Sequence, residues 1–375
     1  MMRIEVDCER IRCNAEAVIA MGASQSIEVV GVTKACCGHP DVARAMLAGG
    51  VKILAESRLK NVRRLRKANI DAPIMLLRLP SPDEADQVVR LTQVSLNSEV
   101  GTVHALSRAA KARGLIHQVI LMVETGDRRE GVMPDKATDT AREIARLPGI
   151  DLLGIGTNLA GMGGVLPTKK KSEMLIDVAK DIEHALGIRL AVISGGHTVD
   201  LDLILVGEMP ARVNQLRIGE AILLGVNGQS DLPLPLPHQD AFQVVAEVIE
   251  IKTKPSLPEG QIVADAFGRV SHWEDLGFRR RALLAIGEQD MRVSSLRPKR
   301  RGVTMVGASS DLLVLDVTEA DPPVNLGEEL EFAPAYAAVA TAMANNGVTQ
   351  VIKPAKLAKP ALADESANQR IVAID

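Results

Sequence analysis

A lysine that directly follows a buried-strand pattern is the clearest indication of chemistry in this sequence. Lys34 comes after the apolar run Val29–Thr33. An amine at the end of a buried strand loses hydration, which lowers its pKa and leaves more of it unprotonated to act as a nucleophile or a base. The alternative is a structural lysine that extends its ammonium to water or pairs with Glu56 or Glu124.

Two glycine turns farther along the chain offer backbone amides to an anion. The first is Ser194-Gly195-Gly196-His197-Thr198 and the second is Arg217-Ile218-Gly219. In a (β/α)8 barrel, the loops after the last two strands often hold a phosphate with backbone N–H groups at a helix N-terminus. The alternative is that both segments are only turns.

Other motifs carry less chemistry. Gly161-Met162-Gly163-Gly164 does not satisfy GxGxxG, so we expect no dinucleotide there. The seven histidines show no HxH, HExxH or CxxC-type spacing, so we expect no metal site. Cys36-Cys37 is interpreted as a small buried apolar pair rather than a redox centre. The basic runs 279–281 and 299–301 are interpreted as solvated surface.

The elements that must position these residues alternate between β-rich and helical patterns. Eight β-rich runs occur before residue 225, and amphipathic segments with helical spacing lie between them. This pattern predicts a (β/α)8 TIM-type barrel over residues 1–230, with an open doubly wound sheet as the alternative. The predicted strands are Val29–Thr33, Val51–Ala55, Ile74–Leu79, Val94–Asn97, Gln118–Glu124, Leu152–Thr157, Leu190–Ser194 and Arg217–Leu224.

A change in the sequence pattern, from alternating β-rich and helical segments to a proline-rich run followed by β-rich segments, marks a second domain. Residues 231–238 read DLPLPLPH, and alternating prolines stiffen a linker and exclude a helix. Residues 239–354 predict a mostly antiparallel β domain, and the Ala-, Lys- and Pro-rich residues 355–375 a flexible tail. The strands predicted in this domain are Phe242–Ile251, Gln261–Ala266, Ala282–Ile286, Leu312–Val317 and Glu329–Phe332.

Composition limits the class of protein. Hydrophobic residues make up 46% and charged residues 24%, and 44 Lys+Arg against 47 Asp+Glu give a net charge of −3. We therefore expect a globular protein with no nucleic-acid partner. No apolar run reaches the roughly 20 residues of a membrane span, so we expect no membrane association. Four cysteines in so long a chain indicate a reducing cytoplasm rather than a disulfide framework.

In its ordered set of motifs the sequence resembles the fold-type III pyridoxal 5'-phosphate (PLP) enzymes, the alanine racemase family, and within it the ornithine racemase-like branch. The set spans residues 30 to about 340. Its members are Val32-Thr33-Lys34 with Gly38, Asp127-Arg128-Arg129-Glu130-Gly131, Gly156-Thr157-Asn158-Leu159, Ser194-Gly195-Gly196, Leu216-Arg217-Ile218-Gly219-Glu220-Ala221, Gln239-Asp240-Ala241-Phe242, Asp265-Ala266-Phe267-Gly268, Ala285-Ile286-Gly287 and Gly307-Ala308-Ser309-Ser310-Asp311.

The resemblance implies PLP as the cofactor and assigns roles to these residues. Lys34 is similar to the Schiff-base lysine, which also serves as the base on one face of the substrate. Arg217 corresponds to the arginine that faces the pyridine nitrogen. A guanidinium does not give up its proton in a protein, so the ring nitrogen is expected to stay unprotonated. The remaining implied cofactor-binding residues are Arg129, Asn158, Ser194, Gly195, His197, Thr198, Gly219, Glu220 and Tyr336.

The sequence departs from the family where alanine racemases carry the tyrosine that is the second base. Phe267 stands at that position. Asp265, expected on the same strand face two residues earlier, could replace the base or bind a substrate ammonium. Asp311 is the second candidate for the ammonium, and Ser310 is also expected near the substrate, as is Arg129 at its carboxylate.

These implications favour a cytoplasmic, PLP-dependent racemase of an ornithine-like or another basic or small polar amino acid. By resemblance it is a homodimer whose active sites are completed across subunits. Two alternatives remain open from the sequence. One is a PLP-binding carrier without turnover, and the other is a PLP-dependent aldolase of a β-hydroxy amino acid.

Overall fold

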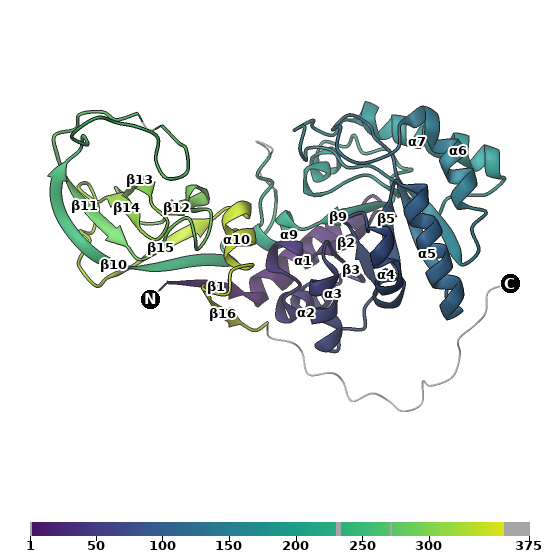
Figure 1. Ribbon diagram of the computed structural model, residues 1–375, viewed down its shortest axis with the longest axis horizontal. Helices are drawn as coiled ribbons and strands as arrows, with labels where there is room; N and C mark the ends of the chain where they lie inside the picture. Colours follow the sequence, from purple (N-terminus) through teal and green to yellow (C-terminus); the bar gives the residue numbers. More distant parts are fainter. Residues whose placement is uncertain (1, 230–233, 271, 356–375) are drawn as a thin grey trace.

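A closed barrel of eight parallel strands forms the first part of the molecule (Figure 1). The structure, a computed structural model, describes residues 2–229, 234–270 and 272–355. The predicted (β/α)8 barrel is therefore confirmed. Its strands are β2 (Glu28–Val32), β3 (Ile53–Glu56), β4 (Ile74–Leu76), β5 (Val94–Asn97), β6 (His117–Met122), β7 (Ile150–Gly156), β8 (Val192–Ser194) and β9 (Gln215–Ile218).

Helices pack around the outside of this barrel (Figure 1). One precedes the first barrel strand, and each of the other eight follows a strand in the order that a (β/α)8 barrel requires. They are α1 (Cys8–Ala23), α2 (Pro40–Ala48), α3 (Leu59–Lys67), α4 (Ala85–Leu91), α5 (Val100–Arg113), α6 (Pro134–Ile144), α7 (Lys169–Leu186), α8 (Leu201–Leu205) and α9 (Glu220–Leu224), with short 3-10 turns η1 (Lys34–Cys36), η2 (Pro82–Glu84) and η3 (Thr198–Asp200).

The barrel is filled with aliphatic side chains from alternate strand positions. Val30 and Val32 of β2 belong to an inner cluster with Met75, Ile120 and Met122, whereas the residues between them face the outer helices. This alternation is the two-residue period of a strand. Because aromatic residues make up only 2% of the chain, Val, Ile, Leu and Met fill the core instead.

The last predicted barrel strand was wrong in its second half. β9 ends at Ile218, and Glu220–Leu224 form the helix α9 instead of continuing the strand predicted to Leu224. A short apolar run of this kind fits a buried strand and a buried helix equally well, so periodicity alone could not separate them. Because the strand ends at Ile218, Gly219 and Glu220 lie at the start of the helix α9.

A mostly antiparallel sheet forms the second part of the molecule, as predicted. Among its described strands, all the pairings are antiparallel except that of β1 with β16. Its elements are β1 (Arg3–Asp7), β10 (Phe242–Pro255), β11 (Phe278–Leu284), η4 (Val293–Ser295), β12 (Leu296–Pro298), β13 (Thr304–Ala308), β14 (Leu313–Asp316), β15 (Glu329–Pro334), α10 (Tyr336–Ala342) and β16 (Thr349–Lys353).

The N-terminal strand belongs to this sheet rather than to the barrel. β1 pairs with β10 and with β16, so residues 3–7 depart from the expected division at residue 230. Residues 231–233 of the expected linker and 356–375 of the expected tail lie outside the described residues.

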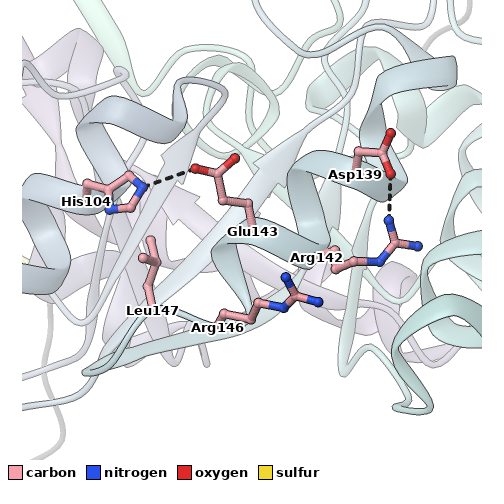
Figure 2. A pocket seen from close by; sticks show the side chains of 6 residues that line it. All are labelled: His104, Asp139, Arg142, Glu143, Arg146 and Leu147. Carbon is pink, nitrogen blue, oxygen red and sulfur yellow. Dashed lines mark hydrogen bonds and ion pairs between the residues drawn. The ribbon is translucent and has the colours of Figure 1, made fainter.

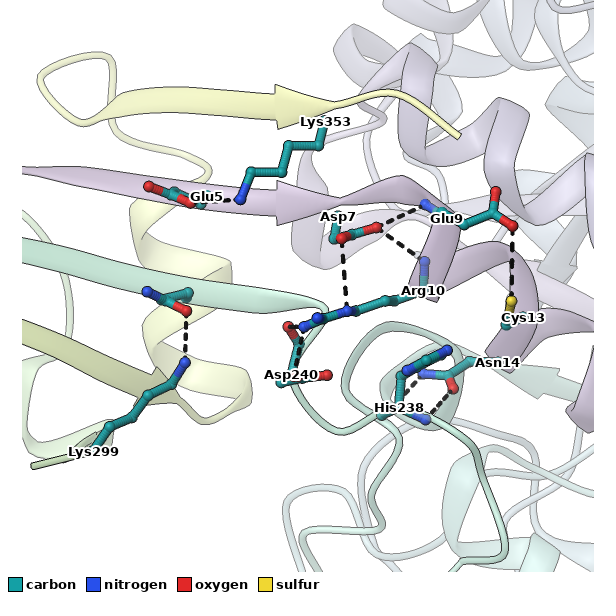
Figure 3. A network of polar contacts seen from close by, with 11 residues as sticks. Glu5, Asp7, Glu9, Arg10, Cys13, Asn14, His238, Asp240, Lys299 and Lys353 are labelled. Atoms are coloured by element: carbon teal, nitrogen blue, oxygen red, sulfur yellow. Dashed lines mark hydrogen bonds and ion pairs between the residues drawn. The ribbon is translucent and has the colours of Figure 1, made fainter. Parts of the chain in front are cut away.

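Polar contacts join the two parts where β1 runs directly into α1 (Figure 3). Asp7 caps α1 by accepting hydrogen bonds from the backbone N–H groups of Glu9 and Arg10, both at 3.1 Å. Arg10 forms an ion pair with Asp240 at 2.5 Å. Asn14 donates to the carbonyl oxygen of His238 at 2.8 Å, which ties α1 to the segment before β10.

The strand predicted at Gln261–Ala266 is not formed. These residues lie in the exposed loop between β10 and β11. The isolated apolar residues Ile262 and Val263 mimic a strand pattern, yet they are 51% and 71% exposed. Without a neighbouring strand to pair with, such a segment remains a loop.

Candidate functional site

Lys34 lies at the carboxyl end of β2, the end of the barrel strands where active sites gather. It is the first residue of η1, and its side chain remains accessible to solvent. The surrounding walls nevertheless remove much of its hydration, and this burial lowers the pKa of Lys34, with help from the positive charges of Arg129 and Arg217. Glu56 and Glu130 act in the opposite direction.

The pairing of Lys34 with Glu56 or Glu124 that the sequence left open is not observed. The Glu56 carboxylate accepts hydrogen bonds from Thr33 Oγ1 at 3.1 Å, from the Ser57 N–H at 2.7 Å and from Asn61 Nδ2 at 3.2 Å. Glu124 accepts from the N–H groups of Gly126 and Arg129. Both carboxylates are therefore occupied by other donors.

Arg217 is a buried cation at the end of β9. Its side chain is held by Ser194 Oγ and by the carbonyl oxygen of Thr157 at 2.6 Å. Burial lowers the pKa of Arg217 to about 10, so the guanidinium is still protonated at neutral pH. Arg217 therefore donates hydrogen bonds in this site and does not accept them.

The turn after β8 is fixed by hydrogen bonds from both sides. The N–H of His197 donates to Asp200 Oδ2 at 2.9 Å, and Nε2 of the His197 ring contacts the carbonyl oxygen of Leu159 at 2.7 Å, a contact in which the ring must be the donor. Burial lowers the pKa of His197 to about 4, and the cations Arg217, Lys34 and Arg129 act in the same direction. His197 is therefore neutral at pH 7.

Thr198, Gly219, Glu220 and Tyr336 form the neighbouring wall. Thr198 Oγ1 accepts a hydrogen bond from the Ala221 N–H at 3.3 Å, which joins the turn after β8 to the start of α9. Burial raises the pKa of Glu220 and raises that of Tyr336 to about 12, with further increases for Tyr336 from Glu220 and Glu56. Tyr336 reaches this wall because α10 packs against η1.

Arg129 lies on the loop after β6, paired with Glu130 through Nε and through Nη2, the latter at 2.7 Å. The adjacent loop after β7 is anchored by Asp127, whose carboxylate accepts from the N–H groups of Gly161, Met162 and Gly163 at 3.2, 2.9 and 3.1 Å. These glycine-rich amides are thus occupied by a side chain of the protein itself.

The structure brings the sequence-predicted barrel residues into one electrostatic cluster. Arg129 and Arg217 each lower the pKa of Lys34, and Lys34, Arg129 and Arg217 all lower that of His197. Asn158 is half-buried between Thr157, which contacts Arg217, and Leu159, which contacts His197. Ser194 ends β8 and accepts a hydrogen bond from Arg217, and Gly195 follows it in the turn.

Asp265 lies elsewhere, on the exposed loop between β10 and β11, and not on a strand face as predicted. Its carboxylate accepts from the N–H groups of Phe267 and Arg269 and from Arg269 Nε at 2.8 Å. These hydrogen bonds lower the pKa of Asp265. In Figure 1 this loop starts at the end of β10 that points away from the barrel and then runs back above β13.

Ser310 and Asp311 lie in the turn between β13 and β14, close to that loop. Ser310 Oγ and Ser309 Oγ both donate to Asp311 Oδ1 at 3.2 Å. Arg269 links the two segments by donating to the carbonyl oxygen of Ala308 at 3.3 Å. The predicted substrate residues of the second domain therefore lie together, and among the described residues no hydrogen bond or ion pair joins them to Lys34.

A shallow pocket of about 480 Å³ occurs between α5 and α6, on the outside of the barrel (Figure 2). His104 and Glu143 are joined across it at 3.1 Å, and Arg142 pairs with Asp139 at 2.6 Å. The pocket contains none of the predicted site residues, so we do not interpret it as the active site.

Two kinds of feature are absent from the described residues. No group of three or more His, Cys, Asp or Glu side chains is arranged to hold a metal ion. No helix within those residues is both long and apolar enough to span a bilayer.

The sequence analysis named Asp127, Glu130 and Thr157 within motifs but gave them no role, and it did not identify Asp200. Asp200 is buried, and no motif drew attention to it. The available signal was its position three residues after His197, which is typical of a carboxylate that caps a turn.

The sequence is similar to one protein family over more than half of its length. The sequence model described as "Alanine racemase, N-terminal domain" matches residues 6–226. The chain belongs to the alanine racemase family. This racemase is 38% identical to the lysine racemase of Thermotoga maritima over 94% of the chain and 98% of that protein. It is 35% identical to the ornithine racemase of Acetoanaerobium sticklandii over 90% of the chain and 95% of that protein.

Solved structures show the same fold. The alanine racemase of Streptomyces lavendulae superposes with a TM-score of 0.71 at 18% identity, over 94% of this chain and 97% of that chain. The D-threonine aldolase of Filomicrobium marinum gives 0.69 at 15% identity, over 91% and 88%. Since both reactions occur on this fold, the arrangement of the barrel and the sheet does not by itself select the chemistry.

Proposed function

We propose that this racemase uses PLP and interconverts the L and D forms of a basic amino acid. The observation that carries the proposal is the Lys34 amine, which has a lowered pKa and lies beside Arg217 and Arg129 at the carboxyl ends of the barrel strands. The lysine and ornithine racemases that match nearly the whole chain support the basic substrate class.

The residues around Lys34 fit PLP by their chemistry. Lys34 Nζ would hold the cofactor through its aldehyde carbon, and the turn at Ser194–Thr198 together with Gly219, Glu220 and Tyr336 would hold its phosphate. Arg217, which is protonated at neutral pH, would donate a hydrogen bond to the pyridine nitrogen. When bound, PLP supplies an electron sink that acidifies the α-hydrogen of the amino acid.

Lys34 Nζ is then the group that moves a proton on one face of the substrate. The lowered pKa leaves a larger neutral fraction of the amine at physiological pH than an exposed lysine would have. Arg129 would bind the substrate carboxylate, while Glu130 fixes its guanidinium in place. Asn158 would lie near the ring.

The other face requires a group from the second domain. Asp265 is bound by Arg269 and by backbone N–H groups, and its pKa is lowered, which makes it a weak base. Of the two roles that the sequence left open, this favours binding of the side-chain ammonium, with Ser310 and Asp311 nearby. Asp265 makes its described hydrogen bonds within its own loop, and in the proposal a second copy in a homodimer brings it to the substrate at Lys34.

The proposed function includes a cytoplasmic location for the protein. All four cysteines are free thiols, which fits a reducing compartment.

Incubation of the PLP-loaded protein with single enantiomers tests the proposal. Lysine, ornithine, serine and alanine would each be supplied as the pure L or D form, and the products separated by chiral chromatography. We expect stereoinversion of lysine or ornithine at a higher kcat/KM than of alanine. Absence of inversion with all four amino acids would contradict the proposal, and cleavage of a β-hydroxy amino acid to glycine would replace it with an aldolase.

A further inference from the structure

Asp200 is a buried carboxylate behind the barrel mouth that the resemblance assigns no role. It ends η3, and only 2% of its surface is exposed. Burial of an ionised carboxylate is unfavourable unless hydrogen bonds and an opposite charge compensate it. The hydrogen-bond donors and the positive charge near Asp200 therefore indicate its role.

The backbone of the turn after β8 lies between Asp200 and Arg217. Asp200 Oδ2 accepts from the His197 N–H at 2.9 Å. On the strand side, the Arg217 N–H donates to the carbonyl oxygen of Gly196 at 2.9 Å. A Cβ added at Gly196 would lie 2.2 Å from Asp200 Oδ2, so only glycine admits the carboxylate at this distance from the turn.

Arg217 needs a compensating charge at this place. It is 4% exposed, and the two groups that accept its side-chain hydrogen bonds, Ser194 Oγ and the carbonyl oxygen of Thr157, are both uncharged. Asp200 is the carboxylate with the strongest effect on Arg217, followed by Glu130, and Arg217 in turn favours the ionised form of Asp200.

We propose that Asp200 is the buried counter-charge of Arg217 and thereby a positioning residue that keeps the guanidinium in the barrel mouth. Asp200 acts through Arg217 and through the turn, and needs no contact with substrate or cofactor. The inference deepens the proposed function, because Arg217 is the residue assigned to the cofactor ring. The test of this inference uses the cofactor-free protein, and the test of the proposed function measures racemisation. Either proposal can therefore fail while the other stands.

A double-mutant cycle on the cofactor-free protein tests the proposal. Hydrogen exchange at pH 7.5, read by mass spectrometry of peptides that cover residues 194–200 and 215–218, would be compared for wild type, Asp200→Asn, Arg217→Met and the double variant. We expect Asp200→Asn to accelerate exchange by about tenfold when Arg217 is present and by less than about threefold in the Arg217→Met background. The same factor in both backgrounds would overturn the proposal.

Asp202→Asn is the matched control. It makes the same change two residues away, on α8, where Asp202 accepts a hydrogen bond from Asn227 at 3.1 Å. We expect its effect on exchange to be the same in both Arg217 backgrounds. A coupling to Arg217 as large as that of Asp200 would mean that the general negative charge of the region, and not Asp200, compensates the arginine, which would also overturn the proposal.

The pH dependence provides a readout that a purely structural role would not change. Burial raises the pKa of Asp200 to about 6, and the charged or titratable groups that act on it are Arg217, Asp202 and the neighbouring His197, which stays neutral down to about pH 4. After correction for intrinsic exchange rates, we expect the coupling to fall from about tenfold at pH 7.5 to below about threefold at pH 5. An undiminished coupling at pH 5 would contradict a charge effect.

If Asp200→Asn does not fold, wild type and Arg217→Met alone decide the question. Acidification from pH 7.5 to 5 protonates Asp200 in both proteins. We expect it to accelerate corrected exchange of the two peptides more in wild type than in Arg217→Met, and equal acceleration would overturn the proposal.

Discussion

His197 gives this protein a predictable loss of stability in acid. Its ring is half-buried near three cations, and its pKa falls from 6.5 to about 4 on folding. As pH decreases, the unfolded chain therefore binds the proton first, so the contribution of His197 to stability is fully present above about pH 6.5 and is lost as pH approaches 4. The whole difference corresponds to about 3 kcal/mol of unfolding free energy, of which about 2 kcal/mol is lost by pH 5.

The variant His197→Gln isolates this effect. Its side-chain amide can still donate to the carbonyl oxygen of Leu159 but cannot take up a proton in this range. We expect urea titration of the cofactor-free proteins to show a loss of unfolding free energy between pH 7.5 and pH 5 that is about 2 kcal/mol smaller for the variant than for wild type. His104→Gln, at the exposed pair with Glu143, is the control and is expected to follow wild type. Equal losses in wild type and His197→Gln would refute the reasoning.

Three further predictions concern the core and the second domain. Ile120→Ala in the fully buried barrel interior should reduce the unfolding free energy by about 2–5 kcal/mol in a urea titration, and a loss below about 1 kcal/mol would contradict the described packing. Gly154→Ala should destabilise the protein by about 1–3 kcal/mol, because the new Cβ would lie 1.9 Å from the carbonyl oxygen of Val192, and an unchanged melting temperature would argue against this strand register. Asp265→Asn should raise KM for lysine and ornithine equally for both enantiomers with little change for alanine, whereas a loss confined to one enantiomer in hydrogen–deuterium exchange of the α-proton would identify Asp265 as a base.

The barrel was predictable from sequence because its strands are buried on both faces and appear as short runs of Val, Ile and Leu. The same property explains the failure at Glu220–Leu224, where a buried helix of five residues has no polar face to reveal its period. The strand β1 was not identified because its partners β10 and β16 lie more than 200 residues later in the chain. Pairing at that separation leaves no local signal.

The residues of the candidate site that could be predicted from sequence are those at or directly after the ends of barrel strands. Lys34, Arg217 and the turn at Ser194–Thr198 meet because the carboxyl ends of parallel strands converge at one end of a barrel. Asp200 and Glu130 act through other side chains, and no spacing rule identifies a carboxylate of that kind. Asp265 was misplaced because apolar residues in an exposed loop resembled a strand, and its ion pair with Arg269 was not predicted.

Borohydride trapping shows directly whether Lys34 carries PLP. Reduction of the PLP-loaded protein, followed by proteolysis and mass spectrometry, should place a pyridoxyl-phosphate adduct on the peptide that contains Lys34, and Lys34→Ala should abolish this adduct. A label on another lysine, or no label in a protein that racemises amino acids, would contradict the account.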